Sequence, residues 1–156
     1  MTNFFDGLTI DIIIRLSVAL LFGMIIGTER ILAHKTAGMR TYALVSMGSA
    51  LFIIISIMIT SGFGANTAFD PMRVAAQIIS AAGFICAGLV FVRKDGITGL
   101  TSSAGLWVSV GIGMATGFGL FKLALVATVL TLFIFIVLWF VEAKLKTSKF
   151  TKDAIE

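Results

Sequence analysis

Long uncharged apolar stretches constrain this chain more than any other feature of its sequence. Four runs of 19 residues or more lack Asp, Glu, Lys and Arg, and they cover residues 41–69, 74–92, 96–121 and 123–141. A helix of about 20 apolar residues spans the hydrocarbon core of a bilayer. Spanning strands would instead need alternating segments of about ten residues, and the sequence shows no such alternation. The pattern therefore predicts an all-α integral membrane protein.

The composition agrees with this class. Hydrophobic residues make up 58% of the 156 residues and charged residues only 13%, whereas a soluble domain carries about 25% charged residues. The net charge of +4 is explained by membrane topology, because the basic residues gather in particular loops. We therefore expect the lipid bilayer as a partner and no nucleic acid.

Turn residues and charges divide the chain into five expected transmembrane helices. We place these helices at residues 10–28, 41–61, 72–92, 102–119 and 121–141, within a transmembrane domain of residues 1–143. Residues 144–156 would form a basic cytoplasmic tail. Asp70 followed by Pro71 is typical of a helix start, with Asp as the N-cap and Pro at the first helical position.

Basic residues are distributed unequally between the two sides of this arrangement. Nine Lys and Arg fall in the first loop, the third loop and the tail, and three fall on the other side. Cytoplasmic loops carry the excess of Lys and Arg. The distribution therefore predicts an N-terminus outside the cell and a C-terminus in the cytoplasm.

Small residues recur at spacings that let helix backbones approach closely in a membrane. The fourth expected helix has an uninterrupted stripe at every fourth position, so it should be central. A weak internal repeat, offset by 61 residues, would relate the first two helices to the next two as parallel repeats. The residues expected to serve helix packing are Gly23, Gly27, Gly83, Gly88, Gly105, Ser109, Gly113 and Gly117.

Asp70, Arg73 and Gln77 form a polar group beside an expected membrane segment, on the outer side. In one interpretation Asp70 caps its helix and pairs with Arg73, while Gln77 bonds another helix. In a second, the three line an outward-open vestibule duplicated across a dimer axis. A third is a hydrated Mg²⁺ bridged by Asp70 of two chains, since Mg²⁺ keeps several waters and needs only one or two carboxylates.

A second polar group is expected on the cytoplasmic side, and it comprises Glu29, Arg30, Arg40, Thr41 and Thr101. Because Glu29 and Arg30 are adjacent, they should point to different faces of a helix. Glu29 would then pair with Arg40 or Arg93 across the loops. The group is either a topology anchor or a docking surface or gate near the membrane face.

Hydroxyl residues precede the fourth expected helix at Thr98, Thr101, Ser102 and Ser103. One interpretation makes them the N-cap of that helix. The other is a broken-helix element whose freed backbone groups line a cavity, as in transporters.

The sequence offers no catalytic set. It has one histidine and one cysteine, without a Gly-rich phosphate loop or paired carboxylates at a useful spacing. We therefore expect neither an enzyme nor a cofactor.

Four stretches carry a more specific signal through their order and spacing. They are GxxIGxER from Gly23, AGMRTxALVSxGSAxF from Ala37, DPxRxAAQIxSxxGFxxAG from Asp70 and GxxGLTSSAxLW from Gly96. Together they resemble the MgtC/SapB family of bacterial inner-membrane proteins, over roughly residues 10–141. Many members add a soluble C-terminal domain, which we expect this chain to lack.

The resemblance implies a multi-pass protein of the bacterial cytoplasmic (inner) membrane, linked to magnesium homeostasis, stress adaptation and, in pathogens, virulence. Family members are viewed as regulators that bind other membrane proteins, such as ATP synthase and transporters. We expect this chain to act in the same way and to form a homodimer. The alternative is a transporter or channel for Mg²⁺ or protons, which should show more intramembrane acids than this sequence does.

Overall fold

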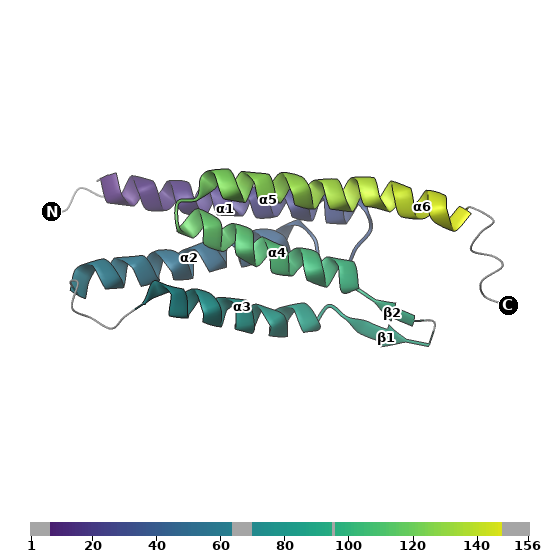
Figure 1. The fold of residues 1–156 in the computed structure, drawn as a ribbon, viewed down its shortest axis with the longest axis horizontal. Helices are drawn as coiled ribbons and strands as arrows, with labels where there is room; N and C mark the ends of the chain where they lie inside the picture. The colour runs from purple at the N-terminus through teal and green to yellow at the C-terminus, as the bar shows by residue number, and fades with distance from the viewer. Residues whose placement is uncertain (1–6, 64–69, 95, 148–156) are drawn as a thin grey trace.

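Long helices lying side by side make up most of the molecule (Figure 1). The structure is a computed structural model that describes residues 7–63, 70–94 and 96–147. Its elements are α1 Gly7–Leu32, α2 Met39–Phe63, α3 Pro71–Ala87, β1 Phe91–Arg93, β2 Gly96–Thr98, α4 Leu100–Gly117, α5 Phe121–Phe133, the π-helical turn η1 Ile134–Leu138 and α6 Trp139–Thr147. The last three follow one another without interruption and form one long rod. Five helical rods therefore confirm the predicted helical class.

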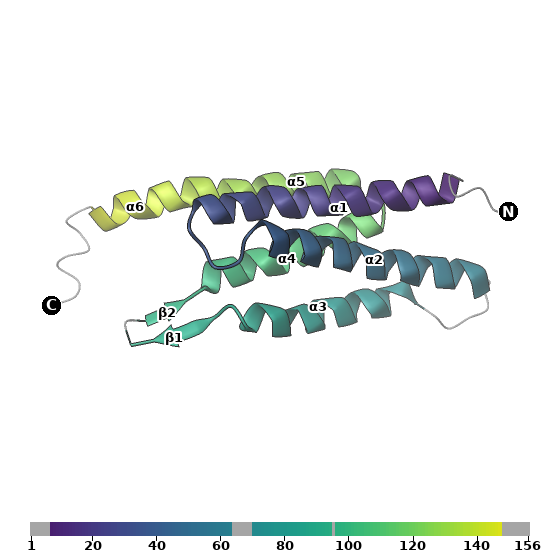
Figure 2. The ribbon, with the colours of Figure 1, turned by 180° about the vertical axis from the view of Figure 1, so that it is seen from behind.

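Successive rods run in opposite directions, so the bundle has two distinct ends (Figures 1 and 2). The end that holds the C-terminus of α1, the two strands and α6 is called the basic end below. Its basic side chains among the described residues include Arg30, Lys35, Arg40, Lys94 and Lys144. The other end holds the start of α1, the start of α3 and the turn between α4 and α5. This is the grouping that the positive-inside argument assumed, although the side of the membrane stays a prediction.

A short β-hairpin corrects the expected third helix. That helix was expected to reach residue 92, but α3 ends at Ala87 and Gly88 is its C-cap. The following strands β1 and β2 pair antiparallel, with Val92 opposite Ile97. Aromatic and β-branched residues favour a strand here. Gly99, at the end of the hairpin, has a positive φ, and a Cβ added there would lie 1.9 Å from the Leu89 carbonyl oxygen. Only glycine therefore fits at this position.

Helix α4 occupies the middle of the bundle, as its small residues predicted. It contacts α1, α2, α3 and α5 and lies between the α1–α5 pair and α3 (Figure 2). A Cβ added at Gly113 would lie 2.0 Å from the Ser46 carbonyl oxygen, and one at Gly117 would lie 2.8 Å from the Ala50 carbonyl oxygen. The backbones of α2 and α4 are therefore close enough that no side chain fits between them at these two positions.

Three helices are long and apolar enough to cross a membrane, judged by length and composition over the described residues. These segments are Gly7–Leu32, Met39–Ser61 and Phe121–Leu145. Helix α3 is apolar but has only 17 residues, and the 18 residues of α4 include many Gly, Ser and Thr. Five crossings and the orientation therefore remain predictions. The expected basic tail falls largely on residues 148–156, outside the described part of the chain.

Candidate functional site

The most elaborate polar site lies at the basic end and centres on Arg30. This side chain is only 3% exposed although it sits in the last turn of α1. Its Nε and Nη2 both bond Oε2 of the neighbouring Glu29. The guanidinium carbon lies 3.5 Å from the centre of the Phe135 ring, which is a cation–π contact. Arg30 therefore has both a charged and an aromatic partner.

This arrangement corrects the expected pairing of Glu29. Adjacent side chains on a helix were expected to diverge, and Glu29 was expected to reach Arg40 across the loop. Glu29 instead pairs with Arg30, and Arg40 is exposed. The Cα–Cβ bonds of Glu29 and Arg30 point in different directions, but the Arg30 side chain is long enough to bend back to Glu29. The Arg93 side chain, the other expected partner, lies outside the described residues.

Tyr42 supports the aromatic side of this site. It is fully buried, and its hydroxyl donates a hydrogen bond to the Ser102 carbonyl oxygen at 2.8 Å. A Cβ added at Gly105 would lie 2.3 Å from the Phe135 ring and 3.0 Å from the Tyr42 hydroxyl oxygen. The absence of a side chain at Gly105 therefore makes room for the ring on which Arg30 stacks.

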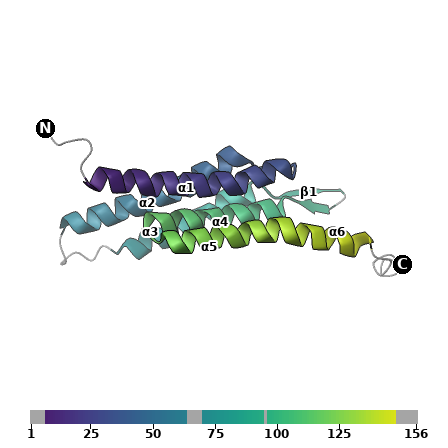
Figure 3. The same ribbon diagram turned by 90° about the horizontal axis from the view of Figure 1, so that it is seen from above.

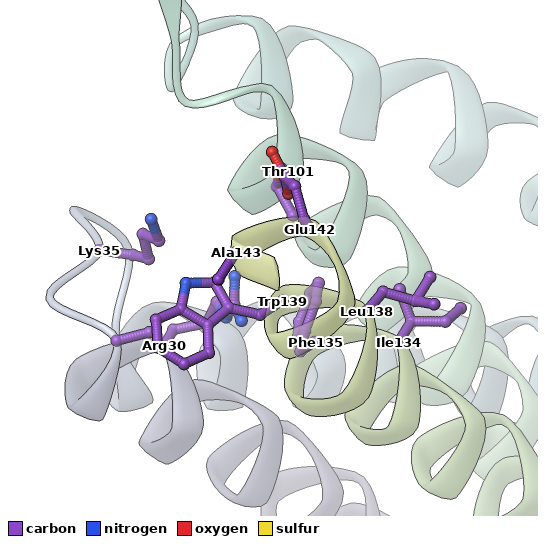
Figure 4. Close-up of a pocket in the computed structure, with 10 residues that line it drawn as sticks. Arg30, Lys35, Thr101, Ile134, Phe135, Leu138, Trp139, Glu142 and Ala143 are labelled. Carbon is purple, nitrogen blue, oxygen red and sulfur yellow. The ribbon is translucent and has the colours of Figure 1, made fainter. Parts of the chain in front are cut away.

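A cavity of about 540 Å³ opens beside these groups (Figure 4). We call it the Arg30 cavity, and α1, the loop that follows it, α4, η1 and α6 all contribute to its wall. Its polar lining comes from Arg30, Lys35, Thr101 and Glu142, and its apolar lining comes mainly from the η1–α6 rod. A second cavity of about 630 Å³ lies between the α1–α2 loop and the hairpin, and Lys35 and Thr101 line both.

Two members of the expected cytoplasmic group have only partial roles here. Thr101 lines both cavities, whereas Thr41 is half-buried in the first turn of α2 and lines neither. The expected hydroxyl cap of the fourth helix is wrong, because Gly99 is the N-cap and no side chain bonds the first turn. Ser103 instead donates to the Cys86 carbonyl oxygen and joins α4 to α3.

Arg15 organises the other end of the bundle, and the sequence reasoning missed it. Its Nε lies 2.7 Å from Oδ2 of Asp11, and its Nη1 donates to the Gly117 carbonyl oxygen at 2.8 Å. A cation beside the last carbonyls of a helix is stabilised by the helix dipole and satisfies an orphan acceptor. A charge inside an apolar segment was a signal that it needed a partner, but nothing in the sequence pointed to Gly117.

Asp70, Arg73 and Gln77 do not converge on one site. Asp70 caps α3, since its Oδ1 accepts from the Met72 amide at 2.8 Å. No ion pair joins Asp70 to Arg73 in the described part of the chain, where the contact is a backbone bond. All three side chains are exposed, and Gln77 borders an apolar groove of about 460 Å³ between α2 and α3.

The glycines expected to serve packing fall into two classes. A Cβ added at Gly23 or Gly27 would lie 2.5 Å from the backbone of the residues that begin α2, and Ser109 is buried and donates to the Tyr42 carbonyl oxygen. Gly83 has nothing within 4 Å of an added Cβ, and Gly88 meets only carbonyls of its own helix. Among the described residues Gly83 and Gly88 therefore make no close contact with another helix, and helix packing at these two positions stays a prediction.

Metal ligands are not gathered anywhere in the described residues. No group of three or more His, Cys, Asp or Glu side chains lies close enough there to hold an ion. The two polar sites offer cations, hydroxyls and helix ends for recognition.

Comparison with known proteins places this arrangement in a family. The sequence profile of the MgtC family matches residues 16–144. The chain belongs to the MgtC family. This match includes part or all of each helical rod, and it contains both Arg30 and the Phe135 ring that Arg30 contacts.

Three curated relatives from the MgtC family illustrate the likeness. YhiD of Escherichia coli K12, named as a candidate magnesium transporter, is 42% identical over 132 residues, which cover 81% of this chain and 60% of YhiD. SapB of Bacillus subtilis is 42% identical over 115 residues, covering 72% of this chain and 50% of SapB. MgtC of Salmonella typhimurium LT2 is 42% identical over 120 residues, covering 77% of this chain and 49% of MgtC.

The aligned part of this MgtC-family chain spans 49–60% of the length of these relatives. No solved structure matches it significantly. The relatives therefore establish the family of the helical part, and the activity of the longer proteins enters only as a proposal for this chain.

Proposed function

We propose that this protein is a multi-pass regulator in the bacterial cytoplasmic (inner) membrane, linked to magnesium homeostasis. It would act by binding a second copy of itself and other membrane proteins of the transporter or ATP synthase class. The name of YhiD supports the link to magnesium. The observation that carries the binding role is a face of α3 that is exposed in the described part of the chain.

We define the outer face of α3 as Arg73, Ala76, Gln77, Ser80, Gly83, Phe84 and Ala87, all of which are exposed. Phe84 is 87% exposed and stands beside Gly83, where no atom lies within 4 Å of an added Cβ. A large side chain next to a notch suits interlocking with another helix. The face also carries Gln77 and Ser80 into the expected membrane region, where a polar group gains from a partner.

The interior of the bundle supports regulation over transport. At their glycines, α1 and α4 approach α2 so closely that the backbones are nearly in contact. This close packing leaves little room between them for a water-filled ion pathway. The acidic side chains of the described residues lie at or near the ends of helices, as at Asp11, Glu29, Asp70 and Glu142. A cation pathway should instead carry acids or a ring of carbonyls across the middle.

Flux measurements and crosslinking together test this proposal. Protein reconstituted into liposomes should give Mg²⁺ uptake no higher than empty vesicles, and Asp70→Asn should change nothing. In membranes, a Ser80→Cys, Cys86→Ser variant should form a crosslinked dimer through the outer face of α3. The matched control is Leu125→Cys, Cys86→Ser, which places the thiol on the exposed side of α5.

The opposite results would favour the alternative. Mg²⁺ uptake that requires Asp70 would make the protein a transporter. Equal crosslinking from α3 and α5 would mean that the outer face of α3 has no preferred partner.

A further inference from the structure

The Arg30 cavity combines features that point to a ligand, and the proposed regulatory role does not use them. A buried arginine beside a cavity of this size is unusual, because charged side chains are almost never fully buried unless they are paired. Arg30 is paired on one edge only. Its Nε and Nη2 share one oxygen of Glu29, while Nη1 has no acceptor among the described residues.

Phe135 fixes the direction of the guanidinium. The ring stacks on Arg30 and fills the space left by Gly105, so the guanidinium cannot turn away without losing this contact. A planar guanidinium held in this way presents its free donors in a defined geometry, which suits carboxylate and phosphate groups. The free edge of Arg30 is thus oriented before any ligand arrives.

A lysine side chain and a helix N-terminus add positive charge to the border of the same cavity. Lys35, in the loop after α1, projects from the wall opposite the η1–α6 rod (Figure 4). Thr101 belongs to the first turn of α4, where Gly99 supplies no side-chain acceptor for the free amide groups. A helix N-terminus carries about half a positive charge and binds anions. Glu29 is paired with Arg30 and Glu142 also lines the cavity, so Lys35 and the uncapped start of α4 supply the preference of the cavity for an anion.

The remaining wall is apolar and exposed. Ile134, Leu138 and Trp139 line the cavity and are about half exposed on the outside of the bundle. Ile134 and Leu138 begin and end η1, whose π-helical turn also turns Phe135 inward, and such turns occur often at functional sites. An apolar strip that runs up to a pocket bordered by Arg30, Lys35 and a helix N-terminus matches an acyl chain and its headgroup. Trp139 is an amphipathic aromatic residue near the end of its rod, and such residues anchor helices at the membrane interface.

We propose that the Arg30 cavity binds a phosphate group, held by Arg30, Lys35 and the first turn of α4. The apolar strip favours the phosphate of an anionic phospholipid such as phosphatidylglycerol. A soluble phosphate offers the same chemistry to the same groups, so the experiment must distinguish the two sources.

The test uses the full chain in phosphatidylcholine nanodiscs with a rising fraction of phosphatidylglycerol. Native mass spectrometry then counts the phosphatidylglycerol molecules that stay bound. Lys35→Gln should weaken retention about fivefold, since one basic residue near a surface contributes about that factor for anionic lipid. Arg30→Lys keeps the charge but loses the planar fork and should also weaken it. Lys122→Gln, at the start of α5 on the other end, is the matched control and should retain lipid like the parent.

Inorganic phosphate separates the two sources. Release of bound phosphatidylglycerol by millimolar phosphate would support recognition of the phosphate group itself, and retention despite phosphate would support recognition of the lipid. Lys35 is exposed, so Lys35→Gln should fold. This variant therefore tests the role of the cavity even if Arg30→Lys fails to fold. Equal retention by the parent, Lys35→Gln and Lys122→Gln, or equal retention of phosphatidylglycerol and phosphatidylcholine, would overturn the proposal.

Discussion

Helices α3 and α4 are similar in length and both contain many small residues, but they have different surroundings. Helix α3 has 17 residues and its small residues are mostly Ala, whereas α4 has 18 residues and its small residues are mostly Gly and Ser. The two helices pack against each other. Ten residues of α4 are buried, whereas α3 buries only Ala75, Ala82 and Cys86. Seen from above, α4 lies between α1 and α5 (Figure 3), and the side views show α3 at the edge of the bundle (Figures 1 and 2).

The difference shows what small residues mean in a membrane helix. They permit close approach of another backbone, but they do not say which backbone approaches. At Gly113 the neighbouring backbone is that of α2, whereas at Gly83 no other element of the described residues lies within 4 Å of an added Cβ. We infer that the contacts of α4 stabilise the fold and that the outer face of α3 is the surface that binds the proposed partner.

The largest expected effect comes from a side chain placed where α2 and α4 meet. Gly113→Ala should destabilise the protein by about 3 kcal/mol, because the neighbour of its new Cβ is a backbone oxygen that cannot rotate away. Thermal unfolding in detergent measures the loss. Gly111→Ala is the matched control on the same helix, with nothing within 4 Å, and it should be neutral or stabilising by up to about 1 kcal/mol. Equal destabilisation by both variants would contradict the close contact of α2 and α4.

Arg15→Ala should have the next largest effect, at about 2 kcal/mol, because it removes a charged hydrogen bond to the end of α4. The same unfolding measurement applies. Lys122→Ala removes an exposed cation from the same end of the bundle and should shift the free energy of unfolding by less than about 0.5 kcal/mol. If Arg15→Ala behaved like this control, the C-terminus of α4 would not depend on Arg15.

Tyr42→Phe should cost about 1 kcal/mol. It deletes the buried hydroxyl that donates to Ser102 and leaves that carbonyl oxygen without this donor. Thr28→Val is the control, because its hydroxyl bonds within an exposed turn of α1. A Tyr42→Phe variant as stable as the parent would show that the bond between α2 and α4 contributes nothing at this position.

Gly83→Leu should have the smallest effect on the folded chain, below about 0.5 kcal/mol, because its new side chain meets open space. The same substitution should strongly reduce crosslinking from Ser80→Cys, Cys86→Ser, since it fills the notch beside Phe84. Unchanged crosslinking would mean that the partner approaches α3 along another face.

The sequence allowed much of the fold to be predicted because its strongest signals are local. The start of α3 followed from Asp70 and Pro71, and the central place of α4 followed from its spacing of small residues. The hairpin at 91–98 was missed because a run of Phe, Val and Ile suits a membrane helix and a strand alike. The Arg30 site was seen only in part, since its pairing with Phe135 depends on a π-helical turn about 100 residues away in the chain.

Length, hydropathy and glycine spacing are properties of neighbouring residues, so the sequence by itself determined the helical class and the family of this protein. Tertiary structure decided which glycines meet a backbone and which polar groups find partners. Arg15 reaches Gly117 and Arg30 reaches Phe135 only after five rods have packed. Contacts between distant residues depend on how the helices are placed in space, and the order of residues along one helix does not contain that information.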